Sequence, residues 1–214
     1  MKKALIVAGA PTDLSEKRIR ELLAGSPTVI AVDSGAHVVH ALGALPTVVV
    51  GDLDSADPDV IADLATAGVE ISNAPVEKDE TDLLLALEWA EAHCVEELEV
   101  IGVTGGRIDH FLAAFGDLAR HAHLRPTIRE SDFDIYFLTP EARGELRSPD
   151  AQDLSAIALL GEAAVSIGGC AYALDRDVLQ PLSGLGVSNI AREGACPSVV
   201  VHEGVVAVMV GRFA

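Results

Sequence analysis

The sequence has little positive charge and few cysteines, and each shortage excludes a class of protein. It holds 15 Lys and Arg against 33 Asp and Glu, a formal net charge of −18. Nucleic-acid surfaces need clustered Lys and Arg, so we expect no nucleic-acid partner. The three cysteines, Cys94, Cys170 and Cys196, lie far apart and show no CxxC spacing. They indicate reduced thiols and exclude a disulfide framework or a zinc site.

Long hydrophobic runs are also missing. Half of the residues are hydrophobic, but no apolar run reaches the length of a membrane span. The N-terminal MKKALIVAGA resembles a signal peptide only weakly, because Pro11, Thr12 and Asp13 end its apolar run too early. We therefore expect a cytoplasmic protein with no membrane partner. Its 214 residues are enough to bury the core of one large domain or of two modest ones.

Two patterns divide the chain. Up to about residue 103, short apolar runs alternate with helix-forming segments, which is typical of βαβ units and a parallel sheet. From about residue 127, short apolar runs are separated mostly by glycines and loops, and Glu203-Gly204 between two such runs predicts a β-hairpin. We predict an α/β domain with a mainly parallel sheet over residues 1–139 and a smaller, mainly β domain over residues 140–214.

The stretch TVVVGDLDS, residues 47–55, is the first candidate site. Its three valines predict a strand buried on both faces, and Asp52 and Asp54 follow where the strand ends. Open α/β sheets bind ligands at the carboxyl ends of their strands. Two adjacent acids repel each other unless a cation or a proton separates them, and Mg²⁺ commonly bridges carboxylates to substrate phosphates. The alternative is an aspartate-rich loop in which Asp54 only caps the next turn.

A second acidic pair precedes a strongly helix-forming run. Asp79 and Asp82 are three residues apart, a spacing that brings their side chains to one face of a helix. The alternative is ordinary helix-start chemistry, with Asp79 as the N-cap and Asp82 at the third position. A helix start does not require Lys78, whereas a polyphosphate would bind its ammonium group. We favour a functional role for this segment.

The third candidate is GGRIDH, residues 105–110, directly after a predicted strand. Gly105 and Gly106 allow the backbone to approach a ligand closely, and the following helix N-terminus offers N–H groups to an anion. Arg107 can bind two phosphate oxygens as a planar fork. Alternatively, Asp109 only caps the helix and His110 is a satisfied, partly buried imidazole.

These three motifs, in this order, resemble the thiamine pyrophosphokinase family. The turn Asp33-Ser34-Gly35-Ala36 is similar to an aspartate–glycine turn of that family. GCAYAL, residues 169–174, and GVSN, residues 186–189, resemble its β-domain signature more weakly. The similarities together span residues 30–190. Three positions depart from the family pattern, namely Leu53, Ala114 and Ala171.

The resemblance implies both an architecture and an activity. It implies a C-terminal β-sandwich that binds thiamine, and a homodimer whose active sites lie between the subunits. The implied reaction is Mg²⁺-dependent transfer of a pyrophosphoryl group from ATP to the hydroxyl of thiamine, which releases AMP. Asp79 or Asp109 would accept the hydroxyl proton, or the proton would leave late without a base.

The resemblance also implies residue roles. The implied metal ligands, which also count among the catalytic residues, are Asp52, Asp54, Asp79 and Asp82. The other implied catalytic residues are Arg107 and Asp109. The implied ATP-binding residues are Asp33, Gly35, Lys78, Gly105, Gly106, Arg107 and His110. The implied thiamine-binding residues are Tyr172, Ser188 and Asn189.

Three alternatives from other classes share parts of this pattern. A D-x-D metal-dependent phosphatase of the aspartyl-phosphate type also places two acids after an apolar strand. Its motif usually follows the first strand, whereas here it follows the third, and the pair Asp79 and Asp82 would have no role. A nucleotide-sugar transferase with a D-x-D metal site would need a sugar pocket that the sequence does not indicate. A non-enzymatic nucleotide- or metal-sensing module would bind the same ligands without producing AMP.

Overall fold

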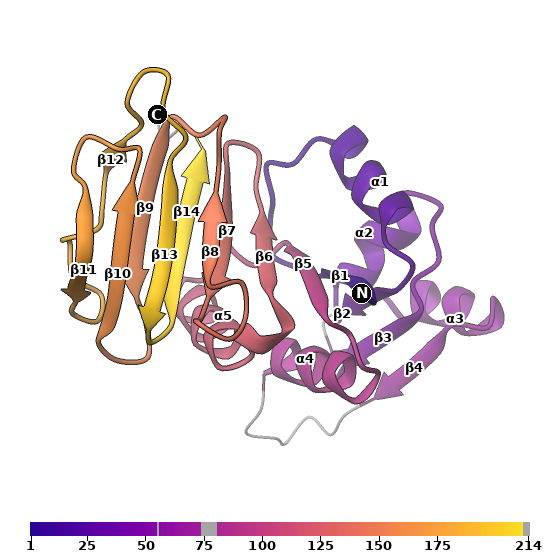
Figure 1. The fold of residues 1–214 in the computed structure, drawn as a ribbon. Helices are drawn as coiled ribbons and strands as arrows, with labels where there is room; N and C mark the ends of the chain where they lie inside the picture. Colours follow the sequence, from indigo (N-terminus) through magenta and orange to yellow (C-terminus); the bar gives the residue numbers. More distant parts are fainter. Residues whose placement is uncertain (55, 74–80, 212–214) are drawn as a thin grey trace. The chain divides into compact units, whose positions relative to one another are not determined.

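The computed structural model describes residues 1–54, 56–73 and 81–211, and the chain forms two compact units, Met1–Asp117 and Leu118–Ala214 (Figure 1). The predicted domain limits, 1–139 and 140–214, stay a prediction. The compact units differ from those limits because the second unit includes strands β6 (Pro126–Arg129) and β7 (Phe133–Leu138).

The first unit alternates strands and helices, as the sequence predicts. Its elements are β1 (Lys3–Val7), α1 (Glu16–Gly25), β2 (Val29–Val32), α2 (Gly35–Ala41), β3 (Val48–Gly51), α3 (Pro58–Thr66), β4 (Glu70–Asn73), α4 (Asp82–Ala92), β5 (Glu97–Ile101) and α5 (Ile108–Arg120), whose last turn extends beyond the unit. The strands lie in the order β5-β1-β2-β3-β4, and all neighbours are parallel. None of the described helices is both long and apolar enough to cross a membrane.

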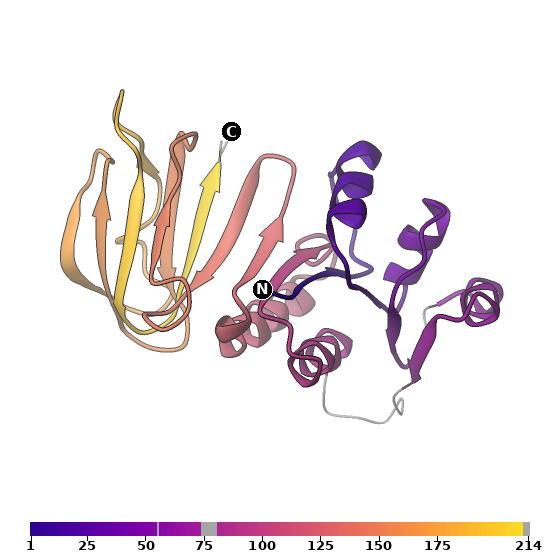
Figure 2. The ribbon, with the colours of Figure 1, turned by 45° about the vertical axis from the view of Figure 1, so that its right-hand side comes forward.

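Helices cover both faces of this parallel sheet, which explains why its inner strands β2 and β3 are buried along their whole length. All four residues of β3 are buried, so the predicted two-sided burial of the three valines is confirmed. Alternate residues of a strand point to opposite faces. Leu5 and Val49 pack with apolar residues of α1, α2 and α3 in one cluster, whereas α4 packs on β2 and β3 from the opposite side (Figure 2).

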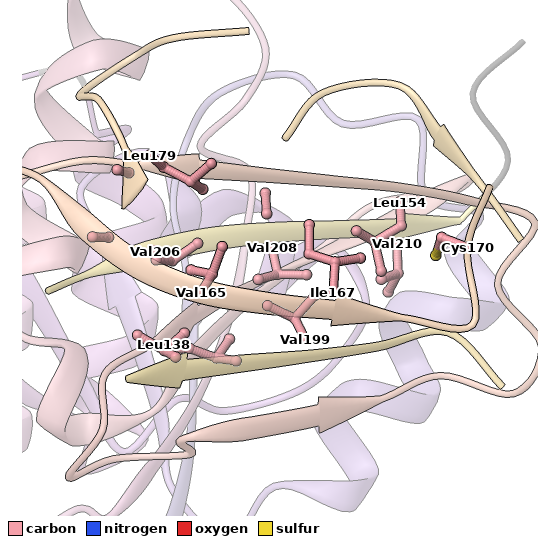
Figure 3. Packing of buried hydrophobic residues seen from close by; sticks show 14 of the residues in the cluster. Leu138, Leu154, Val165, Ile167, Cys170, Leu179, Val199, Val206, Val208 and Val210 are labelled. Carbon is pink, nitrogen blue, oxygen red and sulfur yellow. The ribbon is translucent and has the colours of Figure 1, made fainter. Parts of the chain in front are cut away.

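The second unit is built from antiparallel strands. Besides β6 and β7 it contains β8 (Glu145–Arg147), β9 (Asp153–Ala158), β10 (Ala163–Gly168), β11 (Leu174–Leu179), β12 (Asn189–Ile190), β13 (Ser198–Glu203) and β14 (Val206–Gly211), with a short 3₁₀ helix at Ala122–Leu124. Strands β12-β9-β14-β7-β6 lie side by side in one sheet, and β11-β10-β13-β8 form the other. Side chains of both sheets share one core, in which Val165 and Ile167 of β10 pack in the same cluster as Val206 and Val208 of β14 (Figure 3).

The predicted hairpin around Glu203-Gly204 is wrong. Strand β13, before the turn, pairs with β10 and β8, whereas β14, after it, pairs with β7 and β9. Gly204 has a φ of +83° and leads the chain from one sheet to the other. A glycine turn between two apolar strands has the same local sequence in both cases, so the sequence does not distinguish a hairpin from a connection between two packed sheets.

Candidate active site

Three carboxylates meet at one edge of the parallel sheet. Strands β2 and β3 are parallel neighbours, so Asp33 after β2 and Asp52 and Asp54 after β3 emerge at the same edge. The Asp33 N–H donates to the Val50 carbonyl oxygen at 2.9 Å, which continues the pairing beyond β2. One carboxylate oxygen of each aspartate lies within 4.8 Å of the other two. The structure therefore joins Asp33 to the pair that the sequence indicates.

The backbone at this edge adopts conformations that allow this close approach. Leu53 has a φ of +62° and Asp33 a φ of +47°, both in the left-handed region that side chains other than Asn and Asp rarely adopt. The Asp54 N–H donates to Oδ1 of Asp52 at 3.1 Å and closes a small turn. A Cβ atom on Gly51 would lie 3.3 Å from Oδ1 of Asp82, so the glycine leaves room for a fourth carboxylate beside the three.

The charges of this cluster act on one another. The pKa of Asp54 is raised above its usual value of 3.8, mainly by the charge of Asp52 and then by burial, a hydrogen bond with Asp52 and the charges of Asp33 and Asp82. Repulsion of this kind is relieved when a cation binds between the carboxylates. A set of carboxylate oxygens is the donor set that Mg²⁺ takes, so these residues fit the predicted metal. Asp79 lies outside the described residues.

The start of α4 explains how Asp82 reaches this edge. Thr81 is the N-cap of the helix, because its Oγ1 accepts a hydrogen bond from the Leu84 N–H at 3.1 Å. The same hydroxyl donates to Oδ2 of Asp117 at 2.9 Å. The alternative in which Asp79 is the N-cap and Asp82 the third position is therefore wrong. Asp82 is the first residue of α4, where the helix dipole favours a negative charge.

A cavity of about 600 Å³ includes part of the acid cluster. Asp33 and Asp82 line it, and the other lining residues come from the same two regions of the chain and from residues 8–11 and 102–114. Its lining residues are Ala8, Gly9, Ala10, Pro11, Val32, Asp33, Ser34, Thr81, Asp82, Leu83, Gly102, Val103, Gly105, Gly106, Arg107, Asp109, His110, Ala113 and Ala114. The cavity thus brings the predicted GGRIDH motif beside the acids. Lys78 lies outside the described residues.

One wall of this cavity, residues 8–11, was not predicted from the sequence, and Gly35 has a different role from the predicted one. The segment 8–11 follows β1, which lies between β5 and β2 in the sheet, and its position after a predicted strand was the available signal. Gly35, predicted to bind ATP, is absent from the lining residues. A Cβ atom on Gly35 would lie 2.0 Å from the Val7 carbonyl oxygen, so this glycine allows α2 to pack on β1.

The glycines of the GGRIDH motif have a measurable steric role. A Cβ atom on Gly105 would lie 2.1 Å from the backbone oxygen of Pro11, so the two loops pack backbone against backbone. Gly106 has a φ of +81°, in the left-handed region that favours glycine. Helix α5 then begins at Ile108, and Asp109 and His110 of its first turn line the cavity. Helix N-termini favour anions, so this wall suits phosphate oxygens.

Arg107 and Asp109 form a bidentate ion pair at the same wall. Nη2 of Arg107 lies 2.6 Å from Oδ2 of Asp109, and Nε lies 3.1 Å from Oδ1. Oδ1 also accepts the His110 N–H at 3.0 Å, so Asp109, in the first turn of α5, binds both Arg107 and a backbone N–H. The Arg107 hydrogen bond, partly opposed by burial and supported by the His110 N–H, lowers the pKa of Asp109 to about 2. Asp109 therefore stays negatively charged at neutral pH.

The three predicted thiamine-binding residues lie in the second unit. Asn189 is 2% exposed, and its side chain accepts the Tyr172 N–H at 3.0 Å and donates to the Tyr172 carbonyl at 2.6 Å. The Tyr172 side chain is 69% exposed. Ser188 has a φ of +58°, and its N–H donates to Oγ of Ser155 at 3.0 Å. Asn189 thus fixes the backbone that presents the Tyr172 ring.

The chain is similar in sequence to known enzymes. A family model described as "Thiamin pyrophosphokinase, catalytic domain" matches residues 19–129, just over half of the chain. Thiamine pyrophosphokinase of Bacillus subtilis (strain 168) is 36% identical over 115 residues, 52% of this chain and 52% of that protein. Thiamine pyrophosphokinase 1 of Oryza sativa subsp. japonica is 29% identical over 99 residues, 44% of this chain and 38% of that protein. The chain thus spans about half the length, or less, of these curated relatives.

The fold is shared with solved structures over nearly the whole chain. The crystal structure of thiamine pyrophosphokinase from Bacillus subtilis aligns with a TM-score of 0.81 at 24% identity and covers 100% of both chains. Thiamin pyrophosphokinase from Candida albicans aligns with a TM-score of 0.78 at 13% identity and covers 98% of this chain and 90% of that one. At these identities the likeness shows the fold alone. The family model, which spans the acid cluster and the GGRIDH motif, shows that the chain belongs to the thiamin pyrophosphokinase family.

Proposed function

We propose that this protein transfers a pyrophosphoryl group from ATP to the hydroxyl of thiamine, giving thiamine diphosphate and AMP. The observation that carries the proposal is the cluster of Asp33, Asp52 and Asp54 beside a cavity walled by the glycine loop and the N-terminus of α5. A hard cation site next to an anion-binding helix start suits a nucleoside triphosphate. Membership in the family supports thiamine as the second substrate.

Asp33, Asp52, Asp54 and Asp82 would hold Mg²⁺. Asp79 is proposed as a further metal ligand on the basis of the resemblance alone. The bound ion would neutralise charge on the phosphates as the bond at the β-phosphorus breaks. The N–H groups of the glycine loop and the start of α5 orient the triphosphate. Arg107 is proposed to bind phosphate oxygens, and Lys78 to add a second positive charge. Phosphoryl transfer requires mainly such positioning and charge neutralisation.

Of the two candidate general bases, Asp79 and Asp109, the ion pair at the start of α5 disfavours Asp109. A carboxylate with a pKa of about 2 is a weak proton acceptor, and Asp109 is already bound to Arg107 and to the His110 N–H. Asp109 therefore acts as a partner that orients Arg107. We propose that the thiamine hydroxyl loses its proton to Asp79 or loses it late, without a base.

The thiamine site is proposed to involve the second unit. Tyr172 presents an exposed aromatic ring, and a cationic ring such as that of thiamine is attracted to an aromatic face. The resemblance places thiamine between two copies of the chain, with Ser188 and Asn189 of one copy, together with the ring of Tyr172, facing Asp52 and Asp54 of the other. We therefore propose a homodimer. We also propose a cytoplasmic location, which agrees with three cysteines that are all free.

A product assay tests this proposal against its alternatives. The protein is incubated with ATP, Mg²⁺ and thiamine, and the nucleotides and thiamine species are separated by chromatography. The proposal predicts AMP and thiamine diphosphate in equal amounts and no AMP when thiamine is omitted. A D-x-D phosphatase would instead release inorganic phosphate without thiamine, and a sensing module would bind ATP without turnover. Either result would overturn the proposal.

A further inference from the structure

One histidine outside the cavity connects the two loops that carry the acids. His37 lies in α2, four residues after Asp33. Its Nε2 accepts a hydrogen bond from the backbone N–H of Asp57 at 2.6 Å. Asp57 is three residues after Asp54 and closes the loop that begins at the end of β3. This contact therefore joins α2, the helix that directly follows the Asp33 turn, to the end of the loop after β3.

Both ends of this contact are anchored in helices. Asp57 is the N-cap of α3, where its Oδ1 accepts the Asp59 N–H at 2.9 Å. His37 projects from the first turn of α2, whose neighbouring residues Ala36 and Val39 are buried in the core. A rigid anchor on each side means that the hydrogen bond limits how far the acid-bearing loop moves away from Asp33.

We infer that His37 is a positioning residue that holds the Asp52 and Asp54 loop at the distance from Asp33 that cation binding requires. This inference rests on the proposed function, because it concerns the metal site of that function. The physical need is clear from the site. Like charges on Asp33, Asp52 and Asp54 drive the loops apart when no cation is bound, and the hydrogen bond to Asp57 opposes that separation.

The contact has a specific chemical requirement. An N–H donor needs a lone pair on Nε2, so the proton of the neutral imidazole lies on Nδ1. A side chain that places an acceptor at the position of Nε2 should replace His37. Gln has the length to do so with Oε1, whereas Asn is too short and Leu offers no acceptor.

The same helix provides a matched control. His40, three residues later, approaches Oδ2 of Asp63 in α3 at 3.6 Å. It links the same two helices and is a histidine of similar exposure, but its partner is a side chain in the middle of α3 and not the backbone of the acid-bearing loop. Replacing His40 by Leu therefore removes a histidine from α2 without removing the contact to Asp57.

The experiment measures Mn²⁺ binding to the full chain without ATP or thiamine, by the electron paramagnetic resonance signal of free Mn²⁺. Asp54→Asn defines the part of the binding that belongs to the acid cluster. An exposed hydrogen bond contributes about 0.5–1.5 kcal/mol, so His37→Leu and His37→Asn should raise the Kd for Mn²⁺ roughly two- to tenfold. His37→Gln and His40→Leu should keep the wild-type Kd. Thermal unfolding of each variant reports whether the fold is intact.

Kinetics give a second readout that a general loss of stability would not produce. In His37→Leu the Mg²⁺ concentration for half-maximal turnover should rise by the same factor as the Kd, whereas kcat at saturating Mg²⁺ should stay at the wild-type value. If the Leu variant does not fold, the comparison of Asn with Gln carries the test alone.

The possible failures are distinguishable. Unchanged Mn²⁺ affinity in His37→Leu or His37→Asn, or a Gln variant as weak as Asn, overturns the role of His37 and leaves the proposed function intact. If the Asp54→Asn variant binds Mn²⁺ as tightly as the wild type, both the role of His37 and the proposed function are overturned, because the acid cluster then holds no cation. Loss of affinity in His40→Leu equal to that in His37→Leu shows that α2 packing matters and the contact to Asp57 does not.

Discussion

At the scale of single residues, the site depends on carboxylates that repel one another in the unliganded protein. Asp54 is exposed and little packing depends on it, so Asp54→Asn should leave the fold intact. Turnover should fall on the order of a thousandfold, because one charged metal ligand is worth several kcal/mol of transition-state stabilisation. The measurement is the initial rate of AMP formation at saturating Mg²⁺.

The matched control is Asp59→Asn, an exposed aspartate in the first turn of α3 that is absent from the acid cluster. It makes the same chemical change and should keep the wild-type rate. An Asp54→Asn protein with near wild-type turnover would remove Asp54 from the site.

The ion pair of Arg107 and Asp109 gives a prediction about pH. The pKa of Asp109 is about 2 in the folded protein, below the usual 3.8, so the pair favours the folded state above pH 3.8 and loses this effect as the pH falls toward 2. Arg107→Ala removes the main cause of the shift, and the pKa of Asp109 should rise toward 3.8. The titration of the Asp109 carboxyl carbon by NMR measures this change. Arg18→Ala, on α1, is the control and should leave the titration unchanged.

A pKa that stays near 2 in Arg107→Ala would show that the His110 N–H, and not the guanidinium, stabilises the carboxylate.

Sequence patterns identified most of the acids but not how they combine. Asp52 and Asp54 stand after a strand of three valines, so their position at a sheet edge was predictable. Asp33 was predicted to contact ATP, and its place among the acids depends on β2 and β3 being neighbours. Strand order is a property of the tertiary fold, because connections of similar length can lead to either side of a strand. Sequence spacing alone therefore does not determine which strand ends meet.

At the scale of secondary-structure elements, close backbone packing around glycine shapes the cavity. In Gly105→Ala the new Cβ atom would lie 2.1 Å from the Pro11 oxygen, so one of the two loops has to move. We expect a loss of about 1–3 kcal/mol in the free energy of unfolding, together with weaker ATP binding. Urea unfolding and ATP titration measure the two effects.

The control for this prediction is Gly25→Ala at the end of α1, where the added Cβ atom has no neighbour within 4 Å. Its free energy of unfolding should stay unchanged or rise by up to about 1 kcal/mol, because alanine restricts the unfolded chain. Equal losses in both variants would mean that the glycine loop is not tightly packed.

The success of sequence reasoning also differs between elements. The alternation of strands and helices in the first unit was predictable, because short apolar runs and helix-forming segments are local signals. The cap of α4 was not, because Asp79, Thr81 and Asp82 are all acceptable near a helix N-terminus. The turn at Glu203-Gly204 was misassigned because the sheet that each strand joins is decided by packing in the core.

At the scale of the whole molecule, the proposed dimer predicts that two inactive proteins restore activity together. Tyr172 is exposed and Asp54 lies in the acid cluster, so Tyr172→Ala and Asp54→Asn should each fold and be inactive or nearly so. If each site combines Asp54 of one copy with Tyr172 of the other, a mixed dimer regains one working site of two. Subunit exchange is followed with two different affinity tags, and activity is measured on the doubly tagged fraction.

A doubly tagged dimer without activity would place the whole site within one copy. A chain that remains monomeric at the assay concentration would exclude the shared site altogether. Mixing either variant with itself is the control and should restore nothing.

In the proposed reaction, the β- and γ-phosphates leave ATP together and become attached to thiamine. The most direct measurement uses ATP labelled with ³²P at either the γ- or the α-position, with Mg²⁺ and thiamine, and follows the label by chromatography. The γ-label should be recovered in thiamine diphosphate and the α-label in AMP, in equal amounts and at equal rates. Recovery of the γ-label as inorganic phosphate, with the α-label in ADP, would contradict it.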